Sequence, residues 1–147
     1  MNAIDLLTDD HRRIEHLFTT YEELGERDVL DRICRELTIH TLVEERLLYP
    51  LVRDRLPDGP VLAEAGVTDH ELVKALVAEA EDTTPAALPE LADELRHAVR
   101  RHVEDEERLV LPRLREVVGE DALEGLGARM ERECAPAAHE RASGDRT

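Results

Sequence analysis

One pattern of eleven residues occurs twice in the chain and constrains the fold more than any other feature. Residues 40–50 and residues 102–112 both read His-x-x-x-Glu-Glu-Arg-Leu-x-x-Pro. On an α-helix four residues advance about 400°, so the histidine and the first glutamate of each copy lie one turn apart on the same face. These pairs are His40 with Glu44 and His102 with Glu106.

Both pairs interrupt a stripe of apolar residues. Leu37 and Leu48 lie at helical spacing around the first pair, and Leu95 and Val110 lie around the second. A buried carboxylate without a partner costs several kcal/mol. We therefore expect a positive group to meet each glutamate inside the protein.

Length and composition favour a single all-α domain. A chain of 147 residues suits one domain with one core. Hydrophobic residues make up 41% of it but aromatic residues only 2%, with no Trp. The core must then be built from Leu, Val, Ile and Ala, which favours helices over a sheet.

The charge and the end of the chain exclude several kinds of partner. Acidic residues outnumber basic ones by 35 to 19, and the formal charge of −16 would repel nucleic acid and anionic lipid. No apolar run approaches the roughly 20 residues of a membrane span, and residues 1–7 are neither long nor basic enough for a signal peptide. We expect a cytoplasmic protein, in which Cys34 and Cys134, lacking C-x-x-C spacing, are free thiols.

Capping residues and prolines divide the chain into helices. Asn2 predicts the start of a first helix that runs to about Gly25, and Asp28 predicts the cap of a second that ends before Pro57. Pro60 suits the first turn of a third helix.

The third helix ends near residues 81–84, and Pro85 or Pro89 opens a fourth that stops near Gly119. Gly66 marks either a break in the third helix or a place where two backbones come close. We expect an up-down-up-down four-helix bundle over residues 1–118, a short C-terminal helix over 119–135 and a disordered tail over 136–147.

Two further histidines fall on the apolar seams of the first and third helices. His11 and His70 each follow an aspartate, so the two halves of the chain repeat each other. Four imidazoles and two carboxylates then converge at similar depth, which predicts a metal site. Imidazole and carboxylate without thiolate suit Fe, Mn or Zn, and two bridging glutamates imply two ions roughly 3.5 to 4 Å apart. The expected ligands are His11, His40, Glu44, His70, His102 and Glu106.

This pattern of separated motifs resembles the hemerythrin-like domain, also called the HHE cation-binding domain, over about residues 1–118. The resemblance implies a non-haem di-iron centre with an oxygen bridge inside a four-helix bundle. It implies that His11 and His40 hold one iron, that His70 and His102 hold the other, and that Glu44 and Glu106 bridge both.

Lys74 departs from the pattern of the oxygen-carrying hemerythrins. Those proteins have a further histidine one turn after the ligand of the third helix, where this chain has Lys74. Each iron then keeps one open place, which favours a ligand that touches both metals. Our hypothesis is a catalase-like oxidoreductase that decomposes hydrogen peroxide, with dioxygen and nitric oxide as further ligands. Lys74 is either a proton donor or partner near the centre, or a side chain that extends to solvent.

Tyr49 and the neighbours of the ligands are secondary candidates. On an ideal helix Tyr49 lies about 140° from the face of Glu44 and misses the metals. Pro50 frees a backbone carbonyl, however, and a kink there would turn Tyr49 inward. Glu45 and Glu107 are interpreted as solvated partners of the arginines that follow them. His16 and His97 are interpreted as surface residues.

Two other classes of function remain open beside the enzyme. The domain could sense iron or oxygen, or bind oxygen without turnover, and pass metal occupancy to a partner. It could also store or donate iron. The sequence leaves the oligomeric state open.

Overall fold

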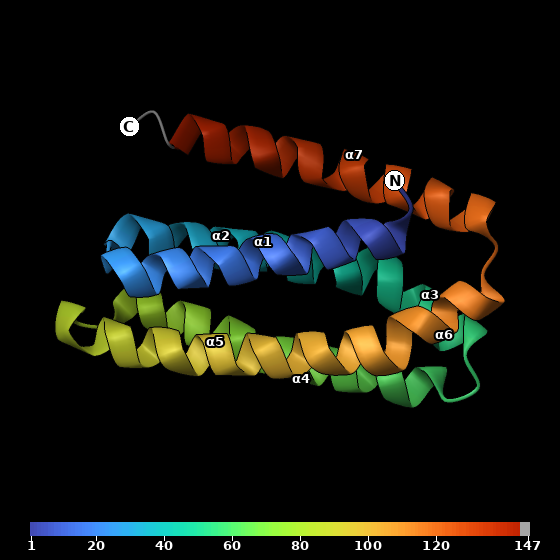
Figure 1. The fold of residues 1–147 in the computed structure, drawn as a ribbon, viewed down its shortest axis with the longest axis horizontal. Helices are drawn as coiled ribbons and strands as arrows, with labels where there is room; N and C mark the ends of the chain where they lie inside the picture. Colours follow the sequence, from blue (N-terminus) through green and yellow to red (C-terminus); the bar gives the residue numbers. More distant parts are fainter. Residues whose placement is uncertain (145–147) are drawn as a thin grey trace.

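The computed structural model describes residues 1–144, and the described residues form helices only. Four helical segments run antiparallel, and a further helix lies alongside them (Figure 1). The elements are α1 Ala3–Leu24, α2 Arg27–Val43, η1 Glu44–Leu48, α3 Tyr49–Arg55, α4 Gly59–Asp82, η2 Pro85–Ala87, α5 Leu88–Asp105, η3 Glu106–Val110, α6 Leu111–Val117 and α7 Glu120–Gly144. The predicted all-α, up-down-up-down bundle is confirmed. No helix among residues 1–144 is long and apolar enough to cross a membrane.

The ends of α1 follow the predicted capping. The side chain of Asn2 accepts a hydrogen bond from the backbone N–H of Asp5, which satisfies one of the free donors of the first turn. Gly25 ends the helix in the left-handed conformation, with φ of 64°, and its N–H bonds the carbonyl of Tyr21.

The start of α2 differs from the prediction. The N-cap is Glu26, whose side chain makes no capping bond, and Asp28 lies inside the first turn. Its charge there still favours the helix, because the N-terminus of a helix carries partial positive charge. The two candidate prolines before α5 both act: Pro85 opens the 3₁₀ turn η2, and Pro89 lies in the first turn of α5.

Each copy of the repeated motif switches from α-helix to π-helix at its first glutamate. The N–H of Tyr49 bonds the carbonyl of Glu44, and the N–H of Leu111 bonds that of Glu106, five residues back in each case. The cause is the proline that follows, since Pro50 and its counterpart lack the N–H that would continue the α-helical ladder. Beyond the switch, α3 and α6 form the same end of the bundle (Figure 1).

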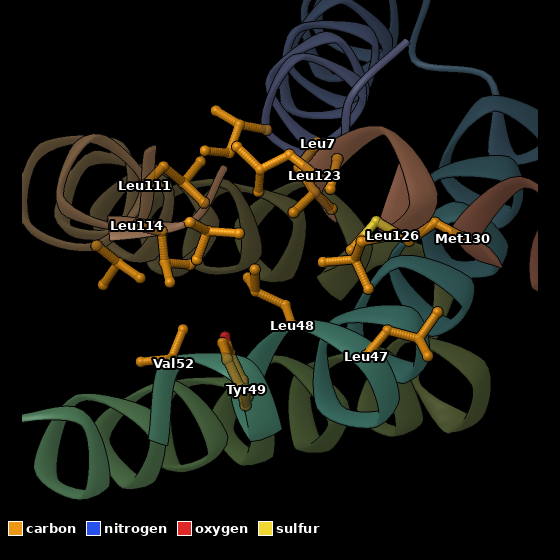
Figure 2. Packing of buried hydrophobic residues seen from close by; sticks show 14 of the residues in the cluster. Leu7, Leu47, Leu48, Tyr49, Val52, Leu111, Leu114, Leu123, Leu126 and Met130 are labelled. Atoms are coloured by element: carbon orange, nitrogen blue, oxygen red, sulfur yellow. The ribbon is translucent and has the colours of Figure 1, made fainter. Parts of the chain in front are cut away.

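Helix α7 covers one side of the bundle. It packs on α1 and α2, opposite α4 and α5 (Figure 1). Leu123, Leu126 and Met130 of α7 are buried in a core cluster with Leu7 and Leu47 (Figure 2). This helix is longer than predicted: it continues past residue 135 to Gly144, and residues 145–147 of the predicted disordered tail lie outside the described residues.

Two apolar clusters fill the bundle and leave a polar layer between them. One contains Leu48, Leu114 and the residues under α7. The other, toward the opposite end, contains Phe18 and Leu95. The seam histidines stand where the chain passes from one cluster to the other, so they are enclosed by apolar side chains on both sides.

Candidate metal centre

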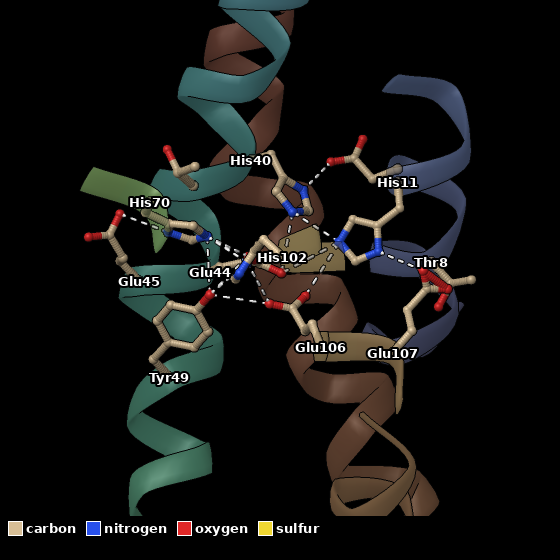
Figure 3. A network of polar contacts seen from close by, with 12 residues as sticks. Thr8, His11, His40, Glu44, Glu45, Tyr49, His70, His102, Glu106 and Glu107 are labelled. Atoms are coloured by element: carbon tan, nitrogen blue, oxygen red, sulfur yellow. Dashed lines mark hydrogen bonds and ion pairs between the residues drawn. The ribbon is translucent and has the colours of Figure 1, made fainter. Parts of the chain in front are cut away.

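The six predicted ligands come together in the polar layer, in contact with one another. They project from α1, α2 with η1, α4, and α5 with η3, and their side chains face inward (Figure 3). All six are buried; Glu44 has an exposed fraction of 0% and His70 of 1%. Two groups of side chains with ligand atoms close enough for a shared ion are His11, His40, Glu44 and Glu106, and Glu44, His70 and His102.

The histidines form two pairs whose Nε2 atoms face each other. His11 Nε2 lies 3.2 Å from His40 Nε2, and His70 Nε2 lies 3.1 Å from His102 Nε2. An octahedral metal with bonds of about 2.1 Å to nitrogen separates neighbouring ligand atoms by about 3 Å. Each pair therefore has the spacing of two adjacent ligands on one ion.

The two glutamates lie between these pairs, and each divides its oxygens between them. Glu44 Oε2 is 3.3 Å from His40 Nε2, while Glu44 Oε1 is 3.0 Å from His70 Nε2. Glu106 Oε1 is 3.4 Å from His11 Nε2, while Glu106 Oε2 is 3.1 Å from His102 Nε2. This is the arrangement that two bridging carboxylates require.

Each histidine has a carboxylate at its other ring nitrogen. Asp10 accepts from His40 Nδ1 at 2.6 Å and Asp69 from His102 Nδ1 at 2.9 Å. The remaining contacts, both 3.3 Å, join His11 Nδ1 to Glu107 and His70 Nδ1 to Glu45. With the proton on Nδ1, the Nε2 lone pair points into the centre, as metal ligation requires.

Glu45 and Glu107 were therefore interpreted wrongly from the sequence. They contact predicted ligand histidines of another helix, whereas Arg46 pairs with Glu133 and Arg108 with Glu104. Asp10 and Asp69 received no role from the sequence. The signal was present, because an aspartate directly precedes both His11 and His70.

The nitrogen and oxygen atoms of these six side chains are better satisfied by a bound cation than by one another. Among the residues whose side chains are described, Glu44 Oε2 and Glu106 Oε1 are buried and have no hydrogen-bond partner. Lone pairs of two imidazoles about 3 Å apart repel each other unless a proton or a metal lies between them. Cations at the two groups would satisfy the oxygens and the nitrogens together.

Without a cation, protons must take its place. Burial alone would lower the pKa of His11 and His102, but the facing carboxylates of Glu106 and Glu44 raise these pKa values to about 9 and about 11. The pKa of His40 is also raised well above its usual value, since Glu44 and Asp10 outweigh burial. Burial would raise the pKa of Glu44, yet the histidines hold it well below the ordinary range.

Tyr49 reaches the centre, so the expectation from an ideal helix was wrong and the kink at Pro50 turns it inward. Its hydroxyl oxygen lies 3.3 Å from Glu44 Oε1 and 3.2 Å from Glu106 Oε2, and its single proton can be donated to either carboxylate. The same oxygen lies 3.1 Å from His70 Nε2 and 3.2 Å from that of His102. A π-turn closes on the fifth residue, which brings Tyr49 onto the face of Glu44. Burial and the two glutamate charges raise the pKa of Tyr49 far above its ordinary value.

Gly66 makes room for this tyrosine. A Cβ atom at Gly66 would lie 2.5 Å from Cζ of Tyr49, closer than packed atoms approach. Helix α4 continues through Gly66, and the group that comes close is a side chain rather than a second backbone. The glycine is thus neither the break nor the backbone contact that the sequence suggested.

Lys74 does not point into the centre. Its side chain is 51% exposed, and its Nζ lies 2.8 Å from Glu45, the carboxylate at His70. His16 and His97 are exposed, as predicted. Cys34 and Cys134 are not joined by a disulfide, and burial raises the pKa of the Cys34 thiol to about 11.

These features define a class of protein: an antiparallel helical bundle with a buried histidine and glutamate cluster suited to binding cations. The chain belongs to the hemerythrin HHE cation-binding domain family, whose model matches residues 2–114. The predicted family is confirmed.

Known proteins agree with this assignment. A crystal structure of a hemerythrin HHE cation-binding domain-containing protein from Mycobacterium kansasii superposes with a TM-score of 0.83 at 22% identity, over 100% of this chain and 93% of the other. At that identity the match shows the fold.

Two curated relatives are longer than this chain. An uncharacterized hemerythrin-like protein of Schizosaccharomyces pombe is 25% identical over 136 residues, which are 87% of this chain and 66% of the relative. A protein named DNA nickase from Nostoc sp. is 28% identical over 122 residues, which are 78% of this chain but only 34% of the relative.

Proposed function

We propose that the centre holds two iron ions and decomposes hydrogen peroxide in a catalase-like reaction, with dioxygen and nitric oxide as further ligands. His11 and His40 would hold one iron, His70 and His102 the other, and Glu44 and Glu106 would bridge them. The observation that carries the proposal is the division of each glutamate between two histidine pairs of ligand spacing. Two irons supply, when bound, the two-electron change that dismutation of peroxide needs.

The residues of the chain would supply orientation and a hydrogen-bond donor. Asp10 and Asp69 fix the rings of His40 and His102 through Nδ1, and they increase the basicity of each ligand. The Tyr49 hydroxyl lies 3.1 Å from His70 Nε2 and 3.2 Å from His102 Nε2, so it could donate a hydrogen bond to a small molecule held beside that pair. Such a hydrogen bond would stabilise the negative charge that develops on a peroxide oxygen as the O–O bond breaks.

The ligand set favours turnover over simple oxygen carriage. Lys74 stands where a further histidine would saturate one iron, and its ammonium instead pairs with Glu45. The four histidines and two glutamates would then leave a place on the metals for peroxide. The charge of −16 supports small molecules rather than nucleic acid as partners, and a cytoplasmic location is part of the same proposal.

The test combines metal analysis with a peroxide assay on one purified sample. We expect two irons per chain and oxygen evolution from peroxide. His102→Ala should remove both, while the matched surface variant His97→Ala should change neither. A sample that binds two irons but evolves no oxygen would contradict the catalytic proposal.

A sensing role is the second candidate, and the position of the centre favours it. The cluster lies between the two apolar clusters and joins all four long helices, so metal occupancy is coupled to the stability of the whole bundle. A bundle that unfolds on chelation, with no turnover when loaded with iron, would favour sensing.

Rapid loss of iron to an acceptor protein would favour a role in iron storage or donation.

A further inference from the structure

A pocket of about 100 Å³ opens between α4 and the segment around η3. Ala65, Asp105 and Leu109 line it and are exposed at the surface; Leu109 has an exposed fraction of 42%. At its inner end the lining consists of His102 and Glu106 together with Tyr49, all buried. The pocket thus connects solvent to the ligand atoms beside the second histidine pair. A single water molecule needs about 10 to 15 Å³ of such space, so the pocket has room for a small molecule.

The other half of the chain closes the equivalent place. Leu7 stands on α1 where Gly66 stands on α4, and Leu111 stands where Tyr49 does. Both leucines are buried, with exposed fractions of 1% and 2%, in the cluster that α7 covers. Leu47, the counterpart of Leu109, is buried there too. Helix α7 and these leucines therefore cover one side of a centre whose predicted ligands repeat on both sides.

A larger hollow of about 290 Å³ lies under α7, but it does not reach the inner ligand atoms. Its lining includes His40 and Asp10, which meet at the Nδ1 side of the ring, away from the metals. Neither Glu44 nor Glu106 lines it. Leu7 also lines this hollow and is buried, with an exposed fraction of 1%.

We infer that the α4–η3 pocket is the entrance through which a small uncharged molecule reaches the metal beside His70 and His102. The inference rests on the proposed function for its metals, but it concerns access and not turnover. Besides Glu106 at the inner end, Asp69 and Asp105 line the pocket, and the charge of these carboxylates opposes the entry of anions. Gly66 and Tyr49 set the depth of the pocket, and Leu109 sets its width at the surface.

The experiment measures association of nitric oxide, a neutral ligand, and of azide, an anion, with the iron-loaded protein by stopped-flow absorption. Leu109→Trp should fill the mouth and slow nitric oxide association by about tenfold or more, the change expected for roughly 1.4 kcal/mol of added barrier. Leu72→Trp is the matched control, since Leu72 lies on α4 with an exposed fraction of 45%, and it should leave the rate unchanged. Asp105→Asn should speed azide and leave nitric oxide as it was.

A readout without metal separates this inference from the proposed function. Xenon should shift the methyl resonances of Val110 and Val52 in the metal-free protein, and Leu109→Trp should abolish the shift. Ala65→Phe is a second plug should Leu109→Trp fold poorly. If the wild-type protein showed no peroxide turnover while the nitric oxide and xenon results were as expected, only the proposed function would be contradicted. The inference would be contradicted if Leu109→Trp and Ala65→Phe both left the nitric oxide association rate and the xenon shifts unchanged. It would also be contradicted if Leu72→Trp slowed nitric oxide association as much as they do.

Discussion

The two halves of the molecule carry the same predicted metal ligands but differ in the side chains that surround them. His11, His40 and Glu44 repeat as His70, His102 and Glu106, down to an acidic partner at every Nδ1. Around the first set, leucines and α7 exclude solvent, whereas around the second a tyrosine, a glycine and a pocket replace them. The comparison indicates that repetition gives the two halves equivalent histidine pairs, and that departures from repetition place the pocket beside one pair only.

The largest effect is expected from substituting the two glutamates that lie between the histidine pairs of the two halves. Glu44→Gln and Glu106→Gln each keep the shape of the side chain but remove a charge shared by both histidine pairs. We expect each variant to lose most of its bound metal, because one bridge serves both ions. Metal analysis after dialysis tests this, with Glu104→Gln on the exposed surface as the control. If one ion were lost and the other fully kept, the carboxylates would not be shared.

The next effect contrasts the covered and open sides through two equivalent leucines. Leu47→Ala should destabilise the protein by about 2 kcal/mol or more, because it leaves a cavity beneath α7. Leu109→Ala should cost about 1 kcal/mol or less, because the side chain is already 42% exposed. Urea unfolding of both variants measures the difference. Equal losses would mean that α7 does not cover one half more than the other.

The metal-free protein should lose stability in alkali. The pKa values of His11 and His102 are raised to about 9 and about 11, so the folded state holds protons that the unfolded state releases above about 6.5. This stabilisation is fully present below the unfolded pKa and is lost as pH rises through the folded values. Unfolding free energy should therefore fall between about pH 6.5 and pH 11. A rise over that range would contradict the account.

The smallest effect concerns the exposed lysine that only one half has. Lys74→Met removes an ion pair with Glu45, and exposed pairs contribute about 1 kcal/mol or less. We expect unchanged metal content and a small change in ligand association, limited to the side of His70. Loss of metal in this variant would show that Lys74 holds Glu45 on the histidine more firmly than its exposure implies.

The repeated motifs allowed the bundle and the six converging side chains to be predicted from the sequence. Polar residues at helical spacing on an apolar stripe, found four times, leave few arrangements that avoid unpaired buried charge. The roles of Asn2 and Gly25 were also predictable, because an Asn side chain can cap the start of a helix and Gly readily adopts the left-handed conformation at its end.

Other features depended on geometry that a regular helix does not have. Tyr49 points inward only because Pro50 causes a π-turn, and the angle of an ideal helix places it elsewhere. Glu45 has a plausible partner in the next residue, so its contact with His70 on another helix could not be read from local spacing. Asp is a residue type that often caps helices, but the N-cap of α2 is Glu26, two residues before Asp28.

X-ray diffraction at the iron absorption edge, on crystals of the iron-loaded protein, tests the central claim most directly. We predict two anomalous peaks, each about 2 Å from one pair of Nε2 atoms, His11 with His40 and His70 with His102, with one oxygen of Glu44 and one of Glu106 near each peak. A single peak, or peaks away from these side chains, would contradict it.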